Sequence, residues 1–78
     1  MTPKARMSLG TDGKHWHLYV VMGCRVYGWP ETTFPAAAGI PAEADRDAAL
    51  ARLGYQVDDT TGWTWINDIL ASVAVRPL

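Results

Sequence analysis

The sequence predicts an α+β domain: a small antiparallel sheet in the order β-β-β-α-β-β, with one helix packed on one of its faces. Three segments predict this fold class. Residues 15–22 are rich in β-branched and aromatic side chains and have a glycine on each side, as expected of a strand between two turns. Residues 41–53 have the composition of a helix and are followed by a glycine. Residues 63–75 alternate apolar and polar side chains in two short runs.

Length and composition limit the chain to one small domain. With 78 residues, it lies near the lower end of what one hydrophobic core stabilises without disulfides or metal. Cys24 is the only cysteine, which excludes an intrachain disulfide and a multi-thiolate zinc site. The formal charge of −1 gives no general attraction to nucleic acid or to an anionic membrane. We expect residues 1–4 to form a disordered end and residues 5–78 to form a single domain.

The first two strands are predicted to form a hairpin around Asp12-Gly13, which is the favoured pair for a two-residue type I′ turn. The turn sets the pairing of the strands, which is Leu9 with Trp16, Met7 with Leu18, Ala5 with Val20, Ser8 with His17 and Arg6 with Tyr19. The first three pairs are apolar and the other two are polar or mixed. Turn chemistry and side-chain alternation therefore predict the same register.

The turn after residue 21 has two alternative lengths. A two-residue turn would place Arg25 on the core face, and burying an unpaired cation is costly. A three-residue turn over Met22–Cys24 keeps Arg25 on the polar face and pairs Gly28 with Leu18. We favour the longer turn, which gives a third strand over residues 25–29.

The remainder of the chain divides into a loop, a helix and short strands. Residues 30–41 contain three prolines and are predicted to form a long irregular loop. A helix is predicted from Pro41 to Leu53, because acidic residues lie near its start and Arg52 lies near its end. Short strands are then expected at residues 55–57, 63–66 and 69–75, with turns at 58–62 and 67–68.

No set of residues predicts catalysis, a cofactor or a metal site. His15 and His17 share a strand face, but two ligands are too few and no other Cys or His completes the set. Cys24 lies about 20 Å along an extended strand from these histidines, too far for a nucleophile and its base. Asp58 and Asp59 are adjacent and point apart in an extended chain. We therefore expect that the protein is not an enzyme, and infer no small-molecule substrate.

An aromatic, weakly basic cluster lies on the polar face of the predicted sheet. Because one helix covers only one face, this polar face is solvated, buried by the C-terminal strands with Trp63 and Trp65, or buried by another chain. We interpret it, together with the 30–41 loop, as the surface of a non-enzymatic interaction or regulatory protein, with a second copy (a homodimer) or another protein as partner. The candidate interaction residues are His17, Tyr19, Arg25, Tyr27, Trp29 and Phe34.

An alternative function is single-stranded nucleic-acid binding, with bases stacked on the same aromatic residues. It is less favoured because the chain lacks a basic excess. The longest apolar run is far shorter than the ~20 residues of a transmembrane helix, and no signal-peptide pattern follows the N-terminus. We expect no membrane association and a cytoplasmic location.

Several segments can be compared with known families. In order, they are Trp16-x-Leu18-Tyr19-Val20-Val21, Trp29-Pro30, Ala44-Asp45-Arg46-x-Ala48-Ala49-Leu50-Ala51-x-Leu53-Gly54-Tyr55, Trp63-x-Trp65, Ala71-Ser72-Val73 and Val75-Arg76-Pro77. Together they resemble a family of short uncharacterised proteins from actinobacteria, over most of the chain from about Trp16 onward. The resemblance implies a source and a fold, and it carries no activity or site residues.

The predicted register gives a first test of the core. Replacing Trp16 with alanine is expected to lower the free energy of unfolding by about 3–5 kcal/mol, the usual cost of removing a large core side chain. Denaturant melts of the two proteins measure this loss. A loss below about 1 kcal/mol would mean that Trp16 lies outside the core.

Overall fold

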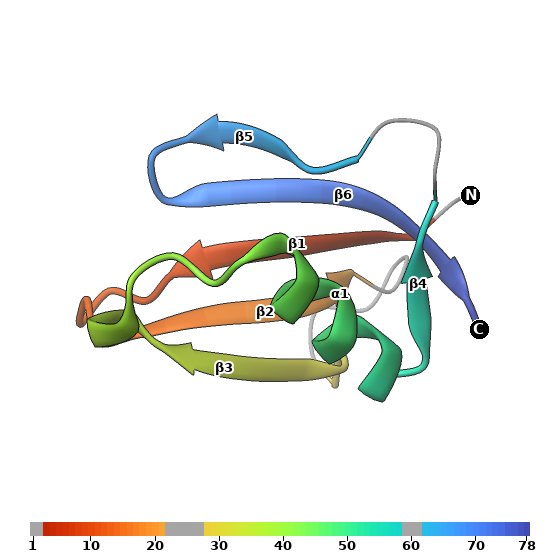
Figure 1. Ribbon diagram of the computed structural model, residues 1–78, viewed down its shortest axis with the longest axis horizontal. Coiled ribbons are helices and arrows are strands. Elements are labelled where there is room, and N and C mark those ends of the chain that lie inside the picture. Colours follow the sequence, from red (N-terminus) through yellow and green to blue (C-terminus); the bar gives the residue numbers. More distant parts are fainter. Residues whose placement is uncertain (1–2, 22–27, 59–61) are drawn as a thin grey trace.

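Six antiparallel strands and one α-helix are present in the computed structural model, which describes residues 3–21, 28–58 and 62–78 (Figure 1). The elements are β1 (Lys4–Leu9), β2 (His15–Val21), β3 (Glu31–Pro35), the 3-10 helix η1 (Ala36–Ala38), α1 (Glu43–Arg52), β4 (Tyr55–Val57), β5 (Thr64–Asn67) and β6 (Leu70–Pro77). The strand order is β3-β2-β1-β6-β4, and β5 also pairs with β6. The predicted α+β class is confirmed. The order β-β-β-α-β-β has one strand too few, because all three of the segments expected to form short strands after the helix do so.

The first hairpin has the predicted register at all five of the pairs named above, from Ala5 opposite Val20 to Leu9 opposite Trp16. Its predicted turn type is wrong, because Gly13 has a positive φ of 69° and Asp12 does not. The Gly10 N–H donates to the His15 carbonyl over 2.8 Å and closes a four-residue loop over residues 11–14, inside which the Gly13 N–H donates to the Gly10 carbonyl over 2.9 Å. A four-residue loop and a two-residue turn with the same centre bring the same residues of the two strands opposite each other, so the register is unchanged.

The third strand lies further along the chain than predicted. Leu18 pairs with Thr32 and not with Gly28, and the Val20 N–H donates to the Pro30 carbonyl over 3.0 Å. β3 therefore occupies residues 31–35, inside the segment predicted to be an irregular loop. Pro30 and Pro35 are tolerated because β3 is an edge strand. No strand of the described residues lies on its outer side, so a proline without an N–H removes no hydrogen bond there. The predicted 22–24 turn and residues 25–27 lie outside the described residues.

Helix α1 is shorter than predicted at both ends, and it lies on one face of the sheet (Figure 1). It ends at Arg52, and Gly54, two residues later, has a φ of 93°, which suits a glycine that follows a helix. Ala49 and Leu50 are fully buried, whereas Ala42, the residue before the helix, is exposed. The core that they join consists of Ala5, Met7, Trp16, Leu18, Val20, Val73 and Val75.

Strand β6 lies next to β1 and carries the C-terminal part of the core. Val73 and Val75 are buried, whereas Ile69 is 50% exposed. Ile69 lies in the turn before β6, where its N–H donates to the Asn67 side-chain oxygen over 2.9 Å. Trp65 of β5 contacts the core edge through Trp16, with ring centroids 6.0 Å apart in an edge-to-face arrangement.

The conformation of Gly13 gives a test of the first hairpin. An alanine at this position keeps open space around its Cβ but must adopt the left-handed φ, so we expect a loss of about 1–2 kcal/mol in the free energy of unfolding. Gly13→Asn is the control, because asparagine tolerates this region better and should lose less. Equal losses for the two variants in denaturant melts would contradict a conformational cause.

Candidate interaction surface

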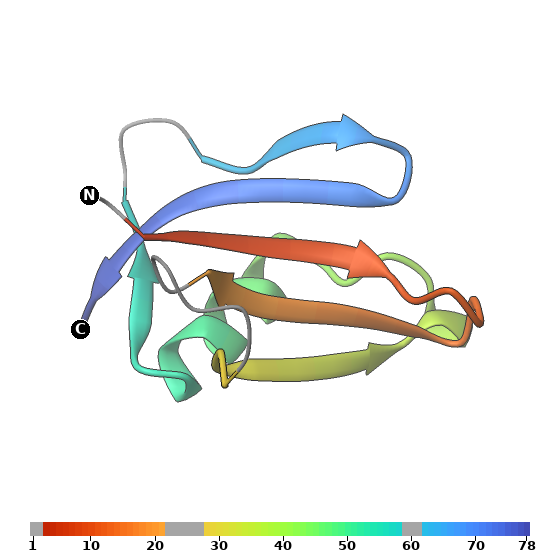
Figure 2. The same cartoon turned by 180° about the vertical axis from the view of Figure 1, so that it is seen from behind.

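The sheet face opposite α1 is here called the open face, and Figure 2 views the molecule from that side. Alternation along each strand puts one set of side chains on this face and the core residues on the other. Every described side chain of the set is half-buried or exposed, in contrast to the core face. The set consists of Lys4, Arg6, Ser8, His17, Tyr19, Val21, Glu31, Thr33, Leu70, Ser72 and Ala74.

An aromatic pair forms the largest feature of the open face. The rings of Tyr19 and Trp29 are stacked, with centroids 5.8 Å apart and planes within 9° of each other. Tyr19 lies in the middle of β2, and Trp29 lies two residues before the start of β3. The Trp29 Nε1 atom is buried and has no hydrogen-bond partner among the described residues. Because each ring covers one face of the other, the two rings form one apolar unit, here called the aromatic plate.

A histidine–carboxylate pair lies beside this plate. His17 Nδ1 and Glu31 Oε1 are 2.8 Å apart, from neighbouring strands. Both side chains are well exposed, at 37% and 49%, so the pair contributes at most about 1 kcal/mol to stability. Its more important effect is to fix the direction of both side chains at the edge of the aromatic plate.

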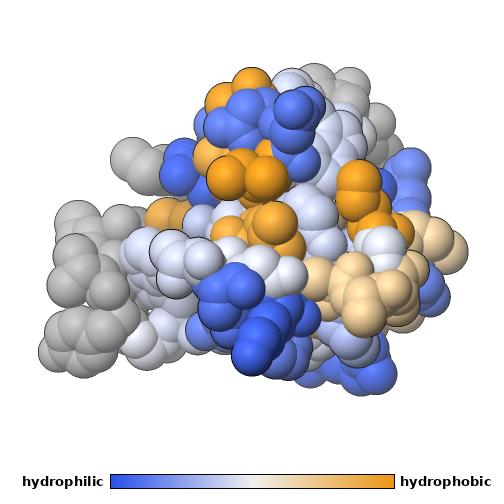
Figure 3. All heavy atoms as spheres, turned by 90° about the vertical axis from the view of Figure 1, so that its left-hand side faces the viewer, coloured by the Kyte–Doolittle hydropathy of each residue, from blue (hydrophilic) through white to orange (hydrophobic). Residues whose placement is uncertain are grey.

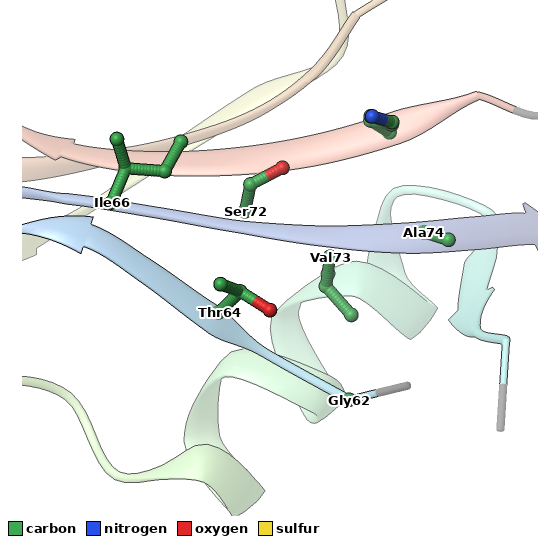
Figure 4. A pocket seen from close by; sticks show the side chains of 7 residues that line it. Gly62, Thr64, Ile66, Ser72, Val73 and Ala74 are labelled. Carbon is green, nitrogen blue, oxygen red and sulfur yellow. The ribbon is translucent and has the colours of Figure 1, made fainter. Parts of the chain in front are cut away.

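A shallow groove lies at the other side of the open face, above β6 (Figure 4). Its volume is about 310 Å³, and small side chains on β6, Ser72 and Ala74, form part of its floor. Lys4 of β1 and Thr64 and Ile66 of β5 border it. Arg6 is opposite Ser72 in the β1–β6 register, so a second cation lies nearby. This groove was not predicted from the sequence, although Ser72 and Ala74 are small residues at alternate positions.

The candidate interaction residues do not all lie on this face. His17, Tyr19 and Trp29 are brought together as predicted. The pairing differs, because His17 is opposite Thr33, whereas the predicted register placed it opposite Trp29. Phe34 is opposite Trp16 on the core face, where it packs against the buried cluster. The predicted residues Arg25 and Tyr27 lie outside the described part of the chain.

The two C-terminal tryptophans lie on the helix side. Arg46 places its guanidinium 4.8 Å from the centre of the Trp63 ring, and Trp63 Nε1 donates to Asp47 of the same helix over 3.3 Å. Arg46 is almost fully buried, so the ring covers its charge. Trp65 contacts Trp16 of the core. Of the three alternatives given above for this face, the one in which Trp63 and Trp65 bury it is therefore wrong.

Metal-binding side chains do not gather within residues 3–21, 28–58 and 62–78. No three His, Cys, Asp or Glu side chains in these ranges are placed to hold a metal ion. The helices of the same ranges are too short or too polar to cross a membrane. The open face carries an aromatic plate, a polar rim and a groove.

The stacked pair can be tested by a double-mutant cycle. We expect Tyr19→Ala and Trp29→Ala to be non-additive by about 0.5–1.5 kcal/mol in the free energy of unfolding, the coupling of an aromatic pair. The control cycle combines Tyr19→Ala with Trp63→Ala, whose rings lie on opposite sides of the sheet and should be additive. Coupling of equal size in both cycles would contradict a specific contact.

Comparison with known proteins places the chain in a family. The model of the family of unknown function DUF6303 matches residues 1–77. The match therefore includes the first strand, which the resemblance from Trp16 onward did not. No curated protein and no solved structure matches the chain. Because the family model covers nearly every residue, the chain belongs to the family of unknown function DUF6303.

Proposed function

We propose that this protein is a non-enzymatic interaction or regulatory protein that acts as a homodimer and binds a protein partner through its open face. One observation carries the proposal: α1 covers a single face of the sheet, and the opposite face holds the stacked Tyr19–Trp29 pair among half-buried side chains. Tyrosine and tryptophan are the residues enriched at the centres of protein interfaces.

The surroundings of the aromatic plate favour a protein as its partner. Apolar area at the centre is bordered by groups of both charges, with Arg6 on one side and Glu31 on the other. A polar rim of mixed charge around an aromatic centre is the usual composition of a protein–protein contact. The segment from residue 30 to 41 contributes to the same surface, because Glu31 and Thr33 of β3 are on the open face.

Single-stranded nucleic-acid binding is the second candidate. It is favoured by the cations Lys4 and Arg6, which lie on the same face as the aromatic plate. Two observations weigh against it. The two rings stack on each other, which leaves fewer free ring faces for bases, and the formal charge of the chain is −1.

An actinobacterial source and a cytoplasmic location are parts of the same proposal. Five of the seven basic residues are arginine, a preference typical of high-GC genomes. The single cysteine is compatible with a reducing compartment, since disulfide frameworks need pairs.

The proposal is tested by affinity capture from the native host followed by titration of the purified partner. We expect Trp29→Ala to weaken partner binding by about 30-fold, the effect of removing an interface hot spot. Asp45→Ser, an exposed position on α1, is the control on the other side of the molecule and should bind like the wild type. Circular dichroism melts confirm that both variants are folded.

Two outcomes would contradict the proposal. Equal partner affinity of Trp29→Ala and the wild type would exclude the open face as the binding surface. Tryptophan quenching by an oligonucleotide that weakens with salt, and that Lys4→Ser with Arg6→Ser abolishes, would favour the nucleic-acid alternative.

A further inference from the structure

Strand β5 is an exposed edge of the sheet. It pairs with β6 on one side, and no strand of the described residues pairs with its other side (Figure 1). All four of its residues, Thr64, Trp65, Ile66 and Asn67, are exposed, and none is charged. An unpaired edge of this kind presents free backbone N–H and C=O groups to any strand that approaches.

The other edges of the sheet are better protected. β3 carries the charged residue Glu31 and ends in Pro35, and both features discourage pairing. β4 has only three residues, Tyr55–Val57, which is short for a stable new pairing. Natural sheets use charge, proline or shortness to prevent edge pairing. β5 has a register irregularity between Trp65 and Asn67, but it carries no charge or proline, and at four residues it is the longer of the two edges that pair with β6.

Large apolar side chains surround the same edge. Trp65 is 39% exposed, Ile66 58% and Ile69 50%. The end of the molecule that carries the β5–β6 turn shows strongly hydrophobic side chains among polar ones (Figure 3). Exposed apolar groups beside an unprotected edge mark a surface that is buried in an assembly.

We propose that two copies of this chain join by antiparallel pairing of β5 with β5, which gives one sheet that is continuous through the dimer. The inference rests on the homodimer of the proposed function and assigns its interface. A second copy is the occupant that the strand fits best. An antiparallel pair related by a two-fold axis uses the same strand twice, and an uncharged strand meets its own copy without repulsion.

The proposed pairing has consequences for both faces of the sheet. If it is centred on Trp65, Thr64 lies opposite Ile66 of the second copy, and the two Trp65 rings meet on the helix side next to Trp16. A two-fold axis perpendicular to the sheet leaves both open faces on the same side. The dimer then presents two Tyr19–Trp29 plates to one partner, which raises avidity without any new contact. A strand of four residues buries little area, so we expect a dissociation constant in the micromolar range.

Analytical ultracentrifugation of the full chain between about 5 and about 500 µM tests the inference. The wild type should show a reversible monomer–dimer equilibrium. Ile66→Lys puts a charge on the edge, and across the two-fold axis it places like charges close together, so dimerisation should weaken by about tenfold or more. Ile40→Lys is the matched control, since Ile40 is 57% exposed and lies in no strand; it should dimerise like the wild type.

A second measurement does not depend on any variant. Amide hydrogen exchange of residues 64–67 should slow as the wild-type concentration rises, because their free N–H groups become paired, whereas exchange in β3 should stay unchanged. Protection in β3 instead of β5 would overturn the inference.

The outcomes separate this inference from the proposed function. A dimer that Ile66→Lys leaves intact, or that Ile40→Lys weakens equally, overturns the β5 interface and leaves the homodimer standing. A wild type that stays monomeric at about 500 µM overturns the homodimer as well. Partner binding that is lost in Trp29→Ala while dimerisation persists supports both proposals, with separate surfaces for assembly and recognition.

Discussion

The layer between α1 and the sheet holds every fully buried side chain in the described part of the chain. The rest of the structure depends on this single core layer. A helix of ten residues is about 15 Å long, which is shorter than the width of a sheet of six strands. The helix therefore covers only part of one face, where Leu50 shares one buried cluster with Met7, Leu18 and Val20. The opposite face and the β5 edge are left without a layer from α1, and the proposed functions arise there.

Agreement between independent signals decides which parts of the fold were predictable. The β1–β2 register follows from the position of the turn and from alternation, and the two signals agree in this sequence. The wrong turn type did no harm, because the loop around Gly13 closes the same pairs. At β3 the local signals were misleading: Pro30 and Pro35 are typical of a loop. The sheet tolerates these prolines only because β3 is an edge strand. The position of a strand in the sheet depends on the whole fold and not on the local sequence.

The candidate site was partly predicted in spite of this error, for a geometric reason. The predicted strand placed Trp29 opposite His17, whereas the observed register shifts the pairing by four residues. Because side chains alternate with a period of two, a shift by an even number keeps each residue on its face. Trp29 therefore lies with Tyr19 as expected. Phe34 was named as an interaction residue because it lay in a predicted loop, where alternation does not indicate a face. In the structure it lies on the core face.

Assembly and recognition need different chemistry, and the sheet offers them at different places. The open face carries side chains of several kinds, and its stacked rings and oriented His17–Glu31 pair suit contact with a partner of defined composition. The β5 edge offers mainly backbone groups, which pair with any compatible strand and need no specific side chain. Pairing through that edge leaves the aromatic plate free, whereas a dimer closed through the open face would bury it. A single helix layer thus leaves room for two separate surfaces in a chain of 78 residues.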